Sequence, residues 1–104
     1  DLPSKLTDGI AYVKLKSPQD KLLWTLALAK ELRMDGLVGS DIVWITDTLG
    51  SGIANNHVSV HYQRLRDKEF ANQSTLTGKM RITDEGLQYL SALPSKQKPT
   101  HQNG

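Results

Sequence analysis

The sequence predicts a small α+β domain in which three helices precede a β-hairpin and a short last helix. Apolar residues recur at helical spacing in three separate stretches between residues 18 and 68. Two short runs with strand character, residues 70–74 and 80–82, flank a turn that contains a glycine. A threonine followed by two acidic residues then opens a further apolar stretch, which is typical of a helix N-terminus.

The composition fits one small globular domain. The chain has 104 residues, of which 38% are hydrophobic and 6% aromatic. Cysteine is absent, which excludes disulfides and cysteine-ligated zinc. The longest apolar run, residues 22–29, is far shorter than the roughly 20 residues that cross a bilayer. We therefore expect no membrane contact and a cytoplasmic location, nucleoid-associated if the chain binds DNA.

Three segments follow from the patterning. Residues 1–16 are expected to form an N-terminal arm, in which Tyr12, Val13 and Leu15 give the character of a possible extra strand. Residues 17–93 hold the domain itself. Residues 94–104 contain no large apolar side chain and are expected to form a disordered tail.

The first helix is expected over about residues 18–33. Ser17 can cap it, Pro18 suits its first position, and an acid follows in its first turn. Its apolar face is wide and marks it as the centre of the core. Trp24 and Leu28 are interpreted as buried, with a dimer contact as the alternative.

The second helix is expected to start at a Ser40 cap and to end at the glycines of residues 50–52. Its apolar face includes Trp44, which we interpret as a core residue. Residues 37–38 before it are expected to be extended. The short glycine-rich segment lacks the downstream pattern of a phosphate-binding loop and is interpreted as an interhelical turn.

The third helix is expected to begin at an Asn55 or Asn56 cap and to run to about residue 68. Val58, Tyr62 and Leu65 form one narrow apolar stripe at this spacing. The opposite face consists mostly of polar side chains. After the hairpin, Thr83 is expected to cap the last helix, which Pro94 would end.

Two stretches resemble the winged helix-turn-helix superfamily. Residues 55–70 resemble a recognition helix that leads into the first wing strand. Glu69 stands where such sequences usually have glycine, so we expect a slightly different helix exit. Residues 81–90 resemble the segment in which a wing strand enters a threonine-capped helix with an internal glycine. The resemblance covers residues 17–93 and implies a three-helix core, a β-hairpin wing and a short C-terminal helix.

This resemblance implies binding to nucleic acid, and double-stranded DNA is the expected partner. Outward amides and hydroxyls on the third helix can contact base edges, Val60 can meet a thymine methyl, and basic side chains can hold phosphates. Two basic residues of the hairpin, with Lys79 at its tip, can reach the DNA backbone or minor groove. The candidate contacts are Asn55, Asn56, His57, Ser59, Val60, Gln63, Arg64, Arg66, Lys79 and Arg81.

The charge distribution supports this expectation only modestly. Residues 53–81 hold five basic and two acidic side chains, whereas residues 1–52 hold six basic and seven acidic ones. Asp67 also lies on the expected DNA-facing side. Specific binding is therefore expected to need a homodimer partner or other domains of a longer parent chain.

Two other partners remain open, namely a protein bound by the same fold and, as a third hypothesis, RNA. Regulation of transcription is the expected role of a DNA-binding module. No set of titratable side chains suggests an enzyme, and no cofactor is expected. His57 and His61 have a spacing that can bind metal, but no third ligand is evident in the sequence, so no metal is expected.

Overall fold

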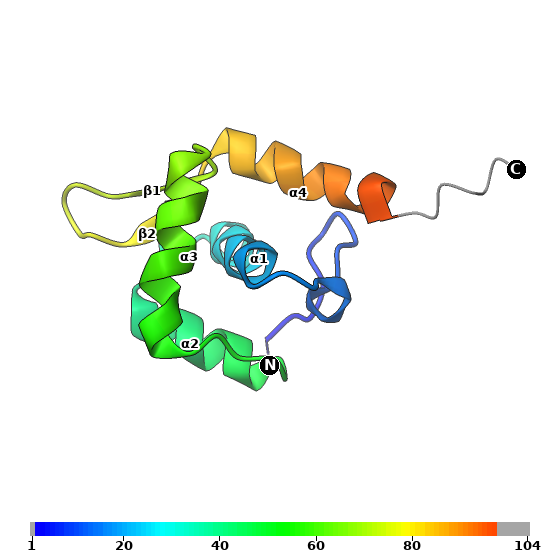
Figure 1. The fold of residues 1–104 in the computed structure, drawn as a ribbon, viewed down its shortest axis with the longest axis horizontal. Coiled ribbons are helices and arrows are strands. Elements are labelled where there is room, and N and C mark those ends of the chain that lie inside the picture. The colour runs from blue at the N-terminus through cyan, green and yellow to red at the C-terminus, as the bar shows by residue number, and fades with distance from the viewer. Residues whose placement is uncertain (1, 98–104) are drawn as a thin grey trace, which may run out of the picture.

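The computed structural model describes residues 2–97, and over these residues the chain is an α+β domain (Figure 1). Four α-helices and a two-stranded antiparallel sheet are described, after a short 3-10 helix. The elements are η1 (Tyr12–Lys14), α1 (Pro18–Glu31), α2 (Gly39–Thr48), α3 (Asn55–Asp67), β1 (Ala71–Gln73), β2 (Met80–Ile82) and α4 (Asp84–Gln97). The tail expected from the sequence lies, from residue 98 on, outside the described residues.

α1 is the centre of the core. The Ser17 hydroxyl accepts a 3.2 Å hydrogen bond from the backbone N–H of Asp20, which confirms the predicted cap. All residues from 22 to 29 are buried. Trp24 and Leu28 are among them, so neither side chain is free on the surface for a dimer contact. No helix within residues 2–97 is long and apolar enough to span a membrane.

The N-terminal arm is ordered against this core, but its second half is not a strand. Lys5 and Ala11 form one isolated antiparallel bridge, and the expected strand residues form η1 instead. The buried Tyr12 ring packs edge-on against Trp24 with ring centroids 5.1 Å apart, and its hydroxyl donates to the Ser51 carbonyl at 2.6 Å. These tertiary contacts override the local strand preference.

α2 starts two residues earlier than expected. Its N-cap is Val38, whose N–H donates to the Asp41 carboxylate at 3.3 Å, so the predicted Ser40 cap is wrong. The prediction for Trp44 is also wrong, because this side chain is 61% exposed. Ile42 and Ile45 face the core, and the 100° step of a helix directs residue 44 to the opposite side.

α3 begins after Ala54, and neither asparagine caps it. The C-terminus of α3 has the capping motif in which glycine is the usual residue, although no glycine is present. Glu69 adopts φ +67, with hydrogen bonds from Glu69 N to Arg66 O and from Phe70 N to Leu65 O, both 2.9 Å. These are the paired bonds of a Schellman motif. The expectation of a different helix exit is therefore wrong, because a glutamate adopts the left-handed conformation that glycine usually supplies.

The hairpin pairs β1 with β2 in the register Ala71↔Ile82, Asn72↔Arg81 and Gln73↔Met80. Met80 also forms an antiparallel bridge with Leu37, so the extended residues between α1 and α2 lie along the second strand. Ala71, Met80 and Ile82 are buried, whereas Asn72 and Arg81 are exposed. One face of the hairpin is thus held on the core and the other faces solvent.

The segment from β2 into α4 is closely packed. The Thr83 hydroxyl accepts from Gly86 N at 3.1 Å, which confirms the predicted cap, and donates to the Glu69 carbonyl at 2.6 Å. A Cβ at Gly86 would collide with the Phe70 carbonyl oxygen, so glycine is required there for close approach.

α4 then continues to Gln97, past the Pro94 at which the sequence predicts its end. Proline has a helical φ but no N–H, so the helix lacks the hydrogen bond to the Leu90 carbonyl. The helix nevertheless runs on to Gln97, and the predicted helix end is wrong.

Candidate nucleic-acid interface

The buried side chains of α3 all lie on its inner face, and its outer face is mostly polar. Val58, Tyr62 and Leu65 are buried, as their spacing predicts, and the helix packs on α1 and α2 through them. The predicted contact residues of this helix are all exposed. They are Asn55, Asn56, His57, Ser59, Val60, Gln63, Arg64 and Arg66.

The residues predicted to contact base edges lie on one side of this helix. Asn56, Ser59 and Gln63 are separated by three and four residues, so they form a row about one helical turn apart. Val60, which is 47% exposed, stands next to that row. This arrangement presents amide and hydroxyl groups with one apolar contact, the chemistry that base edges in the major groove accept.

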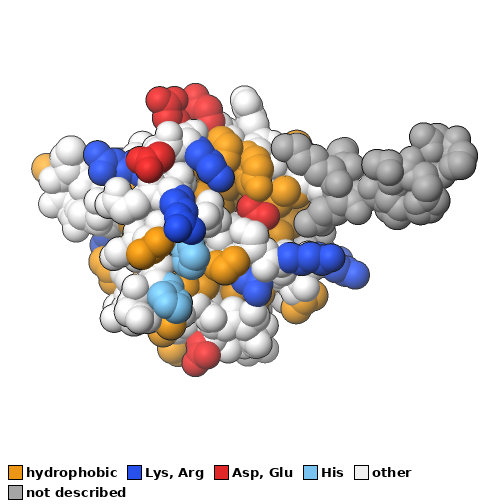
Figure 2. Space-filling model, in the orientation of Figure 1, with side chains coloured by type: hydrophobic (Ala, Val, Ile, Leu, Met, Phe, Trp, Pro, Cys, Tyr) orange, Lys and Arg blue, Asp and Glu red, His pale blue; other side chains and the backbone are white. Residues whose placement is uncertain are grey.

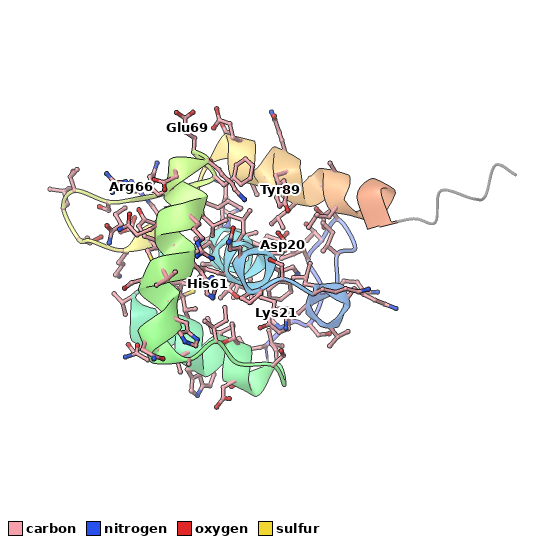
Figure 3. The ribbon with its side chains drawn as sticks, viewed as in Figure 1. Asp20, Lys21, His61, Arg66, Glu69 and Tyr89 are labelled. Carbon is pink, nitrogen blue, oxygen red and sulfur yellow. The ribbon has the colours of Figure 1, made fainter. Side chains whose placement is uncertain are left out.

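Arg64 and Arg66 supply positive charge on either flank. The ion pair found within residues 2–97 joins two other residues, so neither guanidinium is engaged by a carboxylate there. Figure 3 shows Arg66 extending from α3 toward the hairpin. Figure 2 shows basic side chains and histidines along the part of this face that α3 occupies, with acidic side chains at its upper end.

The acidic end of α3 weakens this surface for an anionic partner. Asp67 and Glu69 are both exposed at the C-terminal end of the helix. Lys68 between them donates a 3.3 Å hydrogen bond to the Gln19 side chain and is thereby directed toward α1. The positive region therefore centres on Arg64 and Arg66 rather than on the helix end.

The two histidines of α3 have different surroundings. His57 is exposed, whereas His61 is half-buried and its Nδ1 is buried without a hydrogen-bond partner. Burial, followed by the neighbouring charges of Arg64 and His57, lowers the pKa of His61. It is therefore neutral at physiological pH and adds no positive charge. Within residues 2–97 no group of three or more potential metal ligands occurs.

The hairpin brings Lys79, which directly precedes β2, and Arg81, which lies within β2, to one side. A Cβ built on Gly36 would lie 2.9 Å from a side-chain carbon of each, so both extend past the same point of the chain. Arg81 also lies 4.0 Å from the Asp35 carboxylate, in an exposed ion pair. Such a pair is weak, and a phosphate can replace the carboxylate. Lys79 directly precedes β2 at the base of the hairpin loop, where its carbonyl accepts from Ser74 N at 2.9 Å, whereas the sequence places it at the hairpin tip.

Two residues of the hairpin were not recognised from the sequence as candidate contacts. Asn72 is exposed directly opposite Arg81 in the strand register. Leu76 stands at the tip and is 94% exposed. The alternation of buried and exposed residues in a strand could have identified Asn72, but no sequence signal separates an exposed tip leucine from a buried one.

A shallow pocket of about 210 Å³ lies between the end of α1 and β2, and Met34 and Arg81 are among its lining residues. Its volume is below the roughly 300 Å³ at which small-molecule sites begin. The pocket therefore gives no support to a small-molecule site, and the candidate contacts remain those on α3 and the hairpin.

Comparisons with known proteins do not decide between these uses of the surface. No family model matches the chain, and no curated protein sequence or solved structure matches it significantly. Function has to be inferred from the residues and their arrangement alone.

Proposed function

We propose that this chain is a winged helix-turn-helix module that binds double-stranded DNA through α3 and the hairpin. The order of helix, extended segment, helix, helix, hairpin and helix supports this class. The observation that carries the proposal is the outer face of α3. Its base-reading row is wholly exposed, and the two arginines beside it have no carboxylate partner within the described residues.

The geometry of the hairpin fits the same partner. In Figure 1 the hairpin projects on the side of the molecule where α3 lies, away from the N-terminal arm and the end of α4. A helix seated in the major groove would leave such a hairpin close to the adjacent backbone. Regulation of transcription, with a nucleoid-associated location in the cytoplasm, is the role that this binding would serve.

Binding by one copy is expected to be modest. The acidic residues at the end of α3 oppose phosphate contacts, and few basic side chains are available to replace condensed counterions. A second copy or another domain of a parent chain would supply the remaining affinity.

A protein partner is the second candidate function, and Trp44 favours it. This side chain is 61% exposed on the outer side of α2, where Asp47 is also exposed. An exposed tryptophan is a common anchor in protein interfaces, whereas a nearby carboxylate disfavours DNA. The two functions differ in which helix face is covered.

The test is fluorescence anisotropy of a labelled random DNA duplex at two salt concentrations. Affinity that falls steeply with salt is expected, since phosphate contacts release counterions. A structured RNA of equal length should bind more weakly, because its major groove is too narrow for α3. Absence of duplex binding at low salt and high protein concentration would contradict the proposal and favour a protein partner.

A matched pair of variants locates the interface. Arg64→Ala with Arg66→Ala removes two charges from α3, and Lys14→Ala with Lys16→Ala removes two exposed charges from the N-terminal arm. The α3 variant should lose at least about tenfold more affinity than the arm variant. Equal losses would indicate nonspecific attraction without a defined interface.

A further inference from the structure

The hairpin tip carries an apolar side chain that nothing in the domain covers. Leu76 is 94% exposed, and the next most exposed large hydrophobic residue among those described, Val13, is 72% exposed. The tip lies where the hairpin extends furthest from the helices (Figure 1). Leu76 contributes to no core contact, so its side chain is available to a partner.

The loop that holds Leu76 is held in one conformation by several hydrogen bonds. The Ser74 hydroxyl accepts from the backbone N–H groups of Leu76 and Thr77, at 3.2 Å each. Gly78 closes the turn with φ +74, and its N–H donates to the Ser74 carbonyl at 2.8 Å. The Gln73 side chain donates to the Gly78 carbonyl at 2.9 Å. Much of the entropy cost of ordering this loop on a partner is therefore already met.

The surroundings of the tip suit a partner with an anionic rim and an apolar interior. Residues 70–83 contain no acidic side chain, and they include Lys79 and Arg81. Thr75 and Thr77 flank the leucine with small side chains that leave it as the single bulky group at the tip. The DNA minor groove offers phosphates along its edges, and an apolar side chain that enters it can insert between two base steps.

We infer that Leu76 is an apolar wedge that enters the DNA minor groove beside the α3 contact and partly separates one base step. This inference rests on the proposed DNA-binding function and specifies what the hairpin does there. Lys79 would meet a phosphate at the groove edge while the leucine side chain loses its contact with water. Separation of a base step bends the duplex, so bending is the signature of the wedge.

The experiment compares the wild-type chain with Leu76→Ala and with Val13→Ala as a matched control. Val13 is also exposed and apolar but belongs to the N-terminal arm. Duplex affinity is measured by anisotropy across a salt series, and bending by energy transfer between dyes at the two duplex ends. Because Leu76 packs on nothing, its replacement leaves the fold intact.

Leu76→Ala should bind about tenfold more weakly, since an apolar contact is lost. Its salt dependence should stay unchanged, because no phosphate contact is removed. The energy-transfer signal of bending should disappear. Leu76→Met should restore both affinity and bending, and Val13→Ala should behave as the wild type.

Two outcomes would overturn the inference. If the wild-type chain binds duplex DNA and Leu76→Ala binds and bends it equally well, the wedge is wrong while the proposed function stands. If no variant binds duplex DNA, both fail. In that case, vesicles with anionic lipid that bind the wild type but not Leu76→Ala would assign the tip to a lipid surface.

Discussion

The Tyr89 hydroxyl donates a 2.7 Å hydrogen bond to the carboxylate of Asp20, a residue 69 positions earlier in the chain. The bond joins α4 to the first turn of α1, and both side chains are labelled in Figure 3. The Tyr89 ring also stacks on Phe70, with centroids 4.7 Å apart. The chain that leaves α3 and the start of α1 thus contact the same side chain of α4.

The first prediction concerns alkaline pH. Burial raises the pKa of Tyr12 and of Tyr89 to about 12 from the ordinary 10.0, and for Tyr89 the Asp20 carboxylate adds to this rise. Between these two pH values the unfolded chain releases phenolic protons that the folded chain keeps. The free energy of unfolding should therefore fall as pH rises from 10 to 12.

Urea unfolding followed by circular dichroism at neutral pH, near pH 10 and near pH 12 measures this fall. Tyr89→Phe should be less stable at neutral pH by about 1 kcal/mol, because one hydrogen bond is lost. Its stability should then decline less steeply than that of the wild type in alkali. Parallel declines in the two proteins would show that Tyr89 does not contribute.

The second prediction is that Glu69→Gly stabilises the domain. Glu69 has φ +67, a conformation that costs a residue with a Cβ roughly 1 kcal/mol and glycine almost nothing. The expected gain is about 0.5–1 kcal/mol in the free energy of unfolding, measured by the urea midpoint. Asp67→Gly, inside the last turn of α3, is the control and should destabilise by a similar amount. Destabilisation by both would contradict the strain at residue 69.

The third prediction tests the contact between α4 and the chain that leaves α3. Gly86→Ala would drive a Cβ into the Phe70 carbonyl and to 2.8 Å from Cγ1 of Ile82, so we expect a loss of about 1–3 kcal/mol. Gly39→Ala is the control, because its new Cβ would meet only the Asn55 side chain, at the ordinary distance of 3.7 Å. Thermal unfolding should separate the two variants clearly, and equal midpoints would rule out the close approach at Gly86.

The buried stripe of α3 could be predicted from the sequence because its helix offers a single apolar side. Val58, Tyr62 and Leu65 stand among polar residues, so the helical period alone decides what faces inward. α2 has apolar residues on more than one side. Whether Trp44 or Ile42 is buried then depends on where α1 and α3 lie, which the local pattern does not contain.

The caps show the same limit. Ser17 precedes a proline and caps as predicted, whereas Ser40 is displaced by the pairing of Val38 with Asp41. Each serine has a side chain that can cap a helix, and at the second helix the competing contact of Asp41 decides. The position of Lys79 and the exposure of Leu76 depend on the conformation of the loop, which the Ser74 hydroxyl stabilises by accepting two backbone hydrogen bonds.

The fourth prediction concerns sequence preference. Asn56→Ala with Gln63→Ala should abolish discrimination between DNA sites while leaving the fold and the nonspecific affinity intact. Both residues are exposed and lie in the row that would face base edges. Binding is compared between a site selected from random duplexes and a scrambled duplex of equal length. If the double variant still prefers the selected site, α3 is not the element that reads the sequence.

The fifth prediction concerns the hairpin charges. Lys79→Ala with Arg81→Ala should weaken binding to all duplexes alike, because phosphates carry no sequence information. The slope of log affinity against log salt should become less steep by about one to two units, according to how many phosphate contacts are lost. Competition between phosphate and Asp35 for the guanidinium of Arg81 should make Lys79 the larger contributor.

Asp35→Asn provides the opposite change. It removes the carboxylate that lies 4.0 Å from Arg81, so the guanidinium becomes free for phosphate and affinity should rise at low salt. The rise should vanish when Arg81 is already alanine, because the gain then has no cation to act through. A rise that persists in the Arg81→Ala background would mean that Asp35 acts only through the overall charge of the domain, and the hairpin would lose its assignment as a phosphate contact.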